Sequence, residues 1–358
     1  MTWLTWRQLR VSSSFVIAVL AALAIALALT AHGLHSSYAV DAATFLGQLQ
    51  FNRLDRFLYL AGLIAVLAAP PVIAAFWGAP MIALELEAGT HGLVWTQSTT
   101  RNCWLSTKFA VTGVIAAVAV GAVGLVVTWW ARPIDRAVAA GHGIGPFNLA
   151  RMAPVVFGAR GIVGIGYVLF GLAVGATVGL LLRRSVPAIA VTLAVVAAAE
   201  ILVPLFVRAH LATPVSSTVV ITTDNLEGIQ MRGEPGQPPR GPVFVRVHAG
   251  GPGDWRVTNE TVSSTGSAVA LPAWFGDCVR PRPPAPPPAD GATKVRAGRR
   301  DEFDPCFARL ASEGYRQHVV YQPARNFWAL QVRETGLLLV LAGLLTGFCF
   351  WRINRDVS

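Results

Sequence analysis

Three carboxylates stand out in this sequence because of where they lie relative to its apolar segments. Glu85 and Glu87 are two residues apart in the polar run 81–108, which separates two long apolar stretches, and Glu200 lies inside a third. Carboxylates beside an apolar stretch can accept hydrogen bonds from the first N–H groups of a helix, or pair with a basic residue. A carboxylate within such a stretch can contact a cation or relay a proton. The sequence therefore offers two candidate sites with different chemistry.

The polar run 81–108 has the composition of a segment at a membrane surface. A Gly-Thr pair, Gly89 and Thr90, follows the two acids, and a helix-like piece with large aromatic and basic residues comes next. These residues are Trp95, Arg101, Trp104 and Lys108. Hydrocarbon does not accept so polar a segment, so we expect it at one membrane face, in reach of soluble molecules. The alternative is a solvated helix end without a partner, whose tryptophans anchor it at the interface.

The composition is that of a membrane protein. Of the 358 residues, 54% are hydrophobic and only 13% are charged, and the mean hydropathy is +0.53. Soluble domains carry about 25% charged residues. The net charge of +10 does not indicate a nucleic-acid partner, because the arginines gather at the ends of apolar runs and in one polar segment.

Six apolar segments are long enough to cross a bilayer as helices. They lie at about 15–31, 57–77, 109–130, 160–182, 186–207 and 335–351. Pro70 and Pro71 should kink the second segment, which can extend through Leu84. Tryptophans and arginines in residues 1–14 suit a short interfacial helix before the first span.

Six spans place both termini on one side, and we expect that side to be cytoplasmic. Arg183 and Arg184 occupy a loop of only a few residues on that side, which satisfies the positive-inside rule. Three arginines in the opposite loop weigh against this orientation: Arg132, Arg136 and Arg151.

Residues 208–334 have a different composition and predict a small α+β domain of about 90–120 residues, a size that a disulfide helps to stabilise. Cys278 and Cys306 both lie there, and we expect them to pair if the domain is extracellular. Three β-like runs are expected at Ser217–Thr222, Val243–His248 and Trp255–Val262. A proline-rich linker is expected at 280–290, and a helix with Asp304 as its N-cap at 304–321.

The predicted fold is an all-α polytopic membrane protein with an extracellular α+β domain inserted between helices five and six. Residues 1–207 would hold helices one to five, 208–334 the extracellular domain, and 335–358 helix six with a cytoplasmic tail.

No motif for catalysis is found. A phosphate loop of the form G-x-x-x-x-G-K-[ST] is absent from the sequence, and His32 and His35 lack further ligands for a metal. Gly171, Gly175 and Gly179 repeat every four residues, which predicts a smooth helix face for packing inside the chain rather than against a second subunit.

Glu200 has two interpretations. It can contact a substrate cation or relay a proton, or it can form a structural ion pair with Arg160 at the start of the fourth span. We favour the structural pair.

Three motifs resemble those of type-2 ABC transporter permeases, and more narrowly an actinobacterial subgroup with a large ectodomain between spans five and six. The first runs Glu85-x-Glu87-x-Gly89-Thr90, then Leu93-Val-Trp95-Thr-Gln97, then Arg101, Trp104 and Lys108. The second is Arg183-Arg184-Ser-Val-Pro187, and the third joins Tyr321–Ala324 to Arg325-Asn-Phe327-Trp328. Glu200 stands where such permeases often have a neutral polar residue, which leaves the substrate open.

The resemblance implies a permease subunit of an ATP-driven exporter in the cell membrane, not an enzyme itself. A second permease copy, membrane lipids and a separate ABC ATPase that binds ATP and Mg would be its partners, and nucleic acid would not. The residues implied in coupling to the ATPase are Glu85, Glu87, Gly89, Thr90, Trp95, Gln97, Arg101 and Trp104. The substrate would be amphipathic: a drug, an antibiotic, a peptide or a lipid.

Two other functions fit parts of the sequence. A membrane-anchored sensor or interaction protein would bind ligand through its ectodomain, but six spans exceed what an anchor requires. An ion-coupled transporter would need several intramembrane charges, and the sequence places only Glu200 firmly inside a span.

The expected orientation can be tested with a single cysteine. A Ser267→Cys variant should react in intact cells with a membrane-impermeant thiol reagent, because residue 267 lies in the segment expected outside. Labelling that requires cell lysis would reverse the orientation.

Overall fold

The computed structural model describes residues 2–89, 100–231, 243–279 and 303–356. The chain divides into two compact units, which we call the helical unit (Met1–Ala212 with Ala324–Ser358) and the sheet unit (Thr213–Pro323). The sheet unit is thus inserted between two parts of the helical unit. Its limits fall inside the expected domain 208–334, because the flanking residues continue helices.

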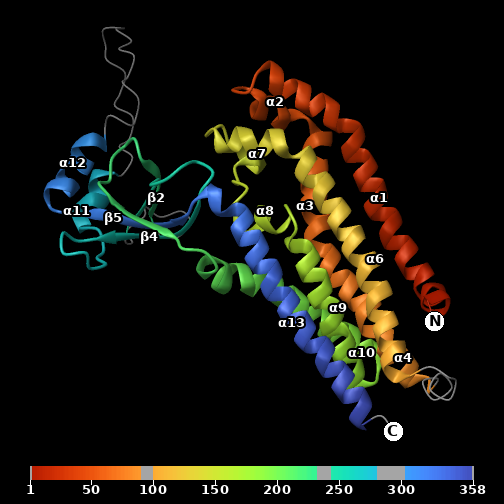
Figure 1. The fold of residues 1–358 in the computed structure, drawn as a ribbon. Helices are drawn as coiled ribbons and strands as arrows, with labels where there is room; N and C mark the ends of the chain where they lie inside the picture. The colour runs from red at the N-terminus through yellow and green to blue at the C-terminus, as the bar shows by residue number, and fades with distance from the viewer. Residues whose placement is uncertain (1, 90–99, 232–242, 280–302, 357–358) are drawn as a thin grey trace. The chain divides into compact units, whose positions relative to one another are not determined.

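The helical unit contains long helices that run side by side (Figure 1). Its longer helices are α1 (Thr2–Val40), α3 (Arg53–Ile73), α6 (Arg101–Trp130), α9 (Val163–Leu182), α10 (Ser185–Leu202) and α13 (Phe327–Asp356). Its shorter ones are α2 (Phe45–Phe51), α4 (Ala79–Glu87), α7 (Arg132–Ala139) and α8 (Pro154–Gly158). Two π-helical turns, η1 (Ala74–Gly78) and η3 (Val203–Val207), extend α3 and α10. Short 3₁₀ turns lie at Gly145–Phe147, Arg208–His210 and Ala324–Asn326.

Six helices among the described residues are long and apolar enough to cross a membrane, as the sequence predicts. They are Ser14–Val40, Arg53–Glu87, Arg101–Trp130, Val163–Leu182, Ser185–His210 and Ala324–Arg355. The first and last described residues lie toward the same end of the helical unit, as an even number of spans requires (Figure 1).

The spans differ from expectation at their ends. The second continues past Pro70 and Pro71 through η1 to Glu87 without a break. The N-terminal residues belong to the same helix as the first span rather than to a separate interfacial helix. The sixth begins before residue 335, so the polar residues that precede this apolar run are helical and belong to the span.

Helix α9 is the most buried of the spans, and its glycines explain why. A Cβ atom added at Gly175 would lie 2.6 Å from the backbone nitrogen of Ala79, and one at Gly179 would lie 2.5 Å from the Ala79 carbonyl oxygen. Only glycine permits so close an approach of α9 to α4. The prediction that the glycine face packs within the chain is confirmed.

The sheet unit has two antiparallel sheets. One contains β1 (Val215–Val219), β5 (Arg316–Gln322) and β4 (Trp255–Val262) in the order β1-β5-β4, and the other pairs β2 (Leu226–Met231) with β3 (Val243–Val247). Helices α11 (Ala273–Cys278) and α12 (Asp304–Ser312) contribute Phe275, Phe307 and Leu310 to a core with Val245, Val247 and Val319.

The predicted helix 304–321 is wrong in its second half. Helix α12 ends at Ser312, and Gly314 turns the chain with a φ of 85°, which glycine adopts without strain. The β-branched pair Val319-Val320 then lies in β5, the central strand of its sheet. Asp304 is not the N-cap, which is Phe303; its carboxylate instead accepts a hydrogen bond from the Thr223 hydroxyl at 2.6 Å.

Two strands of the sheet unit differ from expectation. Strand β2 was not expected, and the strand expected at Ser217–Thr222 ends three residues earlier.

Glu227 connects the two sheets of this unit. This residue of β2 bonds to Arg256 of β4 and lies 3.1 Å from His248 Nδ1. Burial raises the pKa of Glu227, but its hydrogen bonds and the charge of Arg256 outweigh burial and lower the pKa overall. The proline-rich linker at 280–290 lies outside the described residues.

A disulfide joins Cys278 at the end of α11 to Cys306 in α12, as expected. Cys103 and Cys349 are free thiols, the first exposed and the second buried.

Loss of this disulfide should destabilise the sheet unit. The cysteines are 28 residues apart, and closing a loop of that size contributes about 3–4 kcal/mol in the chain-entropy model. We expect Cys278→Ser with Cys306→Ser to lower the unfolding temperature of the full chain, with Cys103→Ser as the control. Detection of both thiols free in the non-reduced wild type would contradict the assignment.

Candidate functional site

The polar run beside α4 contains a buried ion pair. Lys108 of α6 places its Nζ 2.5 Å from Glu85 Oε1 and donates to the Met81 carbonyl oxygen at 2.8 Å. The side chains of Lys108 and Glu85 are 6% and 10% exposed. The Lys108 ammonium also lies 4.6 Å from the ring centre of Trp104. Glu85 therefore joins α4 to α6 and is not a solvated acid.

Glu87, two residues further, is exposed and connects α4 to α10. Its Oε2 accepts the backbone N–H of Ser185 at 2.9 Å and the Ser185 hydroxyl at 2.5 Å. Ser185 is the first residue of α10, so the carboxylate lies at the positive end of that helix. The chain reaches this point by a left-handed turn at Arg183, with a φ of 53°. We expected Glu87 to bind the next short helix or a partner, and the structure shows it at a more distant helix.

The start of α6 is connected to the end of α13. Thr100 caps α6 by accepting the Cys103 N–H, and Arg101 donates to the Ile353 carbonyl oxygen at 3.4 Å. Trp104 is 3% exposed and lies in an apolar cluster with Met81, Leu180 and Ile353. These contacts link α4, α6, α9, α10 and α13 at one end of the helical unit, which we call the coupling end.

The structure describes five of the eight residues implied in coupling, all near the junction of α4 and α6 along the chain. Glu85 and Trp104 are buried, Arg101 is half-buried, and Glu87 and Gly89 are exposed. Gly89 has a φ of 67° at the end of α4. Thr90, Trp95 and Gln97 lie outside the described residues. The coupling role itself stays a prediction for all eight.

The predicted ion pair between Glu200 and Arg160 is wrong. Arg160 follows α8 and is 1% exposed; its Nε instead lies 3.2 Å from Asp135 Oδ2. Asp135 lies in α7, whose position near Arg160 could not be read from spacing along the chain.

A third ion pair, completely buried, was also missed by the sequence analysis. Arg208, at the end of the fifth span, donates from Nε and Nη2 to Glu334 of α13 at 2.6 and 2.9 Å. The Tyr167 hydroxyl of α9 donates to the same carboxylate at 2.9 Å. Glu334 is completely buried. It was assigned to the ectodomain because the apolar run starts at residue 335.

Gln331, one turn before Glu334, caps the buried start of α9. Its Oε1 accepts the N–H groups of Ile162 and Val163, both at 2.9 Å, and its Nε2 donates to the carbonyl oxygens of Phe157 and Arg160. The spacing of Gln331 and Glu334 by one helical turn is the signal in the sequence that could have revealed this site.

Glu200 lines a cavity of about 300 Å³ in the helical unit, which opens to the outside of that unit between exposed residues such as Val155, Ile201 and Leu205. The walls come from α3, α8, α9, α10 and η3, and are mostly aliphatic. The charged residues in the lining are Glu200 and Arg208.

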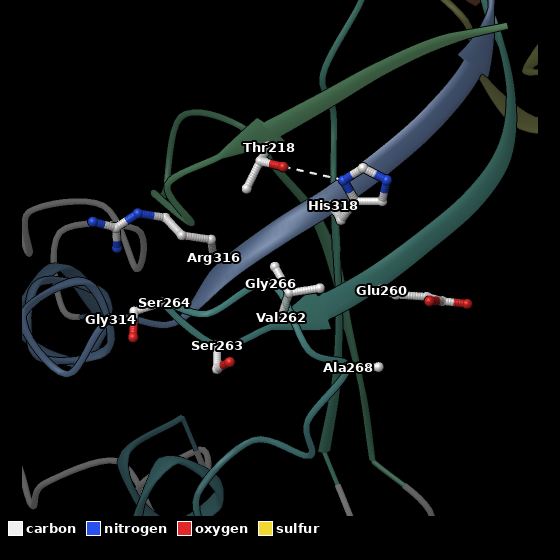
Figure 2. Close-up of a pocket in the computed structure, with 10 residues that line it drawn as sticks. All are labelled: Thr218, Glu260, Val262, Ser263, Ser264, Gly266, Ala268, Gly314, Arg316 and His318. Atoms are coloured by element: carbon white, nitrogen blue, oxygen red, sulfur yellow. Dashed lines mark hydrogen bonds between the residues drawn. The ribbon is translucent and has the colours of Figure 1, made fainter.

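The sheet unit has a separate polar pocket of about 400 Å³ (Figure 2). It is lined by hydroxyl groups together with Glu260, Arg316 and His318. The Thr218 hydroxyl lies 3.1 Å from His318 Nδ1, the contact drawn in Figure 2. The Arg316 guanidinium donates to the carbonyl oxygens of Ala311 and Tyr315, so it mainly closes the end of α12.

Metal ligation finds no support in the part of the chain that the structure describes, where no group of three His, Cys, Asp or Glu residues is arranged around a point. His35 lies against Trp129, with ring centres 5.5 Å apart, and its Nδ1 is 2.8 Å from the Ala31 carbonyl oxygen.

Six apolar spans in one helical unit define a multi-pass membrane protein. The chain belongs to the family described as ABC-2 membrane transporter related, which matches residues 16–208 and so covers the first five spans. Comparisons with curated proteins and with solved structures find no match. Members of this family are membrane components of transporters.

The Glu85–Lys108 pair gives a test of the coupling end. Removing one member leaves the other charge buried, which typically costs about 3–5 kcal/mol. We expect Glu85→Gln or Lys108→Met to lower the unfolding temperature of the purified chain, and the double variant Glu85→Leu with Lys108→Met to recover most of it.

Glu87→Gln is the matched control, because Glu87 is exposed and close in sequence. Equal effects of Glu85→Gln and Glu87→Gln on unfolding would contradict a special structural role for the buried pair.

Proposed function

We propose that this chain is the permease subunit of an ATP-driven exporter that moves an amphipathic substrate across the cell membrane. The observation that carries the proposal is the family match over residues 16–208, which coincides with five of the six apolar spans. ATP and Mg would bind to a separate ATPase subunit. A second copy of the permease would complete the substrate path, surrounded by membrane lipids.

The contacts at the coupling end supply a mechanism. A partner ATPase that pushes on the segment after α4 would move α4 and α6 together through the Glu85–Lys108 pair. The same movement would reach α10 through Glu87 and Ser185, and α13 through Arg101 and Ile353. Motion of packed rigid helices between two arrangements is the usual form of such switching.

The proposed orientation places both termini and the coupling end in the cytoplasm and the sheet unit outside. The disulfide between Cys278 and Cys306 supports this orientation, because disulfides persist in oxidising compartments. The short Arg183-Arg184 turn, beside the Glu87 contact, supports it through the positive-inside rule.

The polar pocket of the sheet unit supports a second candidate function, a membrane-anchored sensor that binds a ligand there. The two candidates differ in one property. A sensor needs no ATPase, whereas the exporter moves its substrate only when an ATPase is present.

The proposal can be tested with the chain, its ATPase partner and vesicles. We expect efflux of an amphipathic dye that requires ATP and both subunits. Glu87→Gln should reduce efflux about tenfold while the protein amount stays normal, because charge-assisted hydrogen bonds at the start of α10 are lost.

Ser185→Ala should reduce efflux less, since the backbone N–H of residue 185 still bonds to Glu87. Asp224→Asn serves as the matched control, because this exposed carboxylate of the sheet unit does not line the polar pocket. Wild-type efflux by the Glu87→Gln variant would show that this contact does not transmit the movement.

A further inference from the structure

The cavity beside Glu200 combines apolar walls with an acidic side chain. It lies among segments distant in the sequence: α3, α8, the start of α9, and the junction of α10 with η3. Its aliphatic lining includes Val66, Pro70, Val155, Pro204 and Leu205. A mostly apolar cavity with few polar groups is the common form of a small-molecule site.

The two charged side chains of the lining differ in how they are bonded. The Arg208 guanidinium is compensated by two hydrogen bonds to Glu334. Glu200 forms no hydrogen bond or ion pair with any residue that the structure describes. Within that part of the chain, Glu200 is therefore the ionisable side chain of the lining that has no partner of opposite charge.

A purely structural role does not account for Glu200. Three other acids of the helical unit each have a basic partner: Glu85 has Lys108, Asp135 has Arg160, and Glu334 has Arg208. A carboxylate within a span is costly without such a partner. Glu200 lacks one and faces a cavity.

We propose that this cavity binds an organic cation with an apolar body, and that Glu200 is the residue that selects the positive charge. The aliphatic walls would bury the apolar body of the ligand, and the carboxylate would lie against its cationic centre. An anion of the same shape would meet a like charge in a medium of low dielectric constant. The further step, that this cation is the exported substrate, rests on the proposed function.

The test is equilibrium binding to the purified full chain in detergent, without ATP or partner. The probes are tetraphenylphosphonium, a permanent lipophilic cation, and tetraphenylborate, an anion of the same shape. We expect the wild type to bind the cation more tightly than the anion. Glu200→Gln should weaken cation binding about tenfold or more, because the charge attraction is lost in a low-dielectric site.

Two further variants separate charge from shape. Val155→Trp should also weaken cation binding, because the larger side chain would occupy part of the cavity while Glu200 is unchanged. Val155 is half exposed, so the protein should tolerate a larger side chain at this position. Asp224→Asn removes an exposed carboxylate of the sheet unit and should bind like the wild type. Thermal unfolding checks that every variant is folded.

Equal affinity of the wild type and Glu200→Gln for the cation overturns the proposal. Equal affinity of the two ions for the wild type overturns it as well. ATP-dependent transport of some substrate together with either result would refute this inference and leave the proposed function intact. Glu200-dependent cation binding without ATP-dependent transport would do the reverse.

Discussion

Compensation of buried charge is the constraint on which the helical unit depends. Lys108, Arg160 and Arg208 are each almost completely buried, and each is held by a carboxylate from another helix. A buried ion without its partner costs several kcal/mol, so each pair restricts which helices can be neighbours. Apolar packing alone would allow the spans to slide or rotate, because lipid tails are as apolar as the helix faces.

The three pairs are distributed along the helical unit and have different consequences. Glu85–Lys108 joins α4 to α6 close to the contact of Glu87 with α10. The exposed Glu87–Ser185 contact therefore lies next to a buried ion pair that fixes the position of α4. Arg208–Glu334, with Tyr167, joins the end of the fifth span to α9 and α13. Glu200 differs from these acids because it faces a cavity rather than a cation.

Local sequence patterns predicted much of the fold but few of the contacts at the candidate site. Span number, the glycine face of α9 and the disulfide follow from apolar run length, four-residue spacing and cysteine location. The pairings did not follow, because they join residues 23 to 126 positions apart that only the folded helices bring together. Glu334 was missed since an apolar run marks only the part of a helix that faces lipid. The helix at 304–321 was extended too far because a short amphipathic helix and a half-buried strand look alike when a single glycine separates them.

The Arg208–Glu334 pair also has a consequence for the order in which the chain is made. Its members are 126 residues apart and flank the whole sheet unit, so Arg208 leaves the ribosome long before its carboxylate exists. At synthesis rates of about 5–20 residues per second, the delay is roughly 6–25 s. During that interval the fifth span carries a guanidinium without its counter-ion, and the start of α9 lacks the amide of Gln331. The first five helices therefore cannot complete their packing until the last helix is inserted. A chain truncated after the sheet unit would leave the Arg208 charge and the start of α9 without their partners, and we expect proteases of the cell to degrade it.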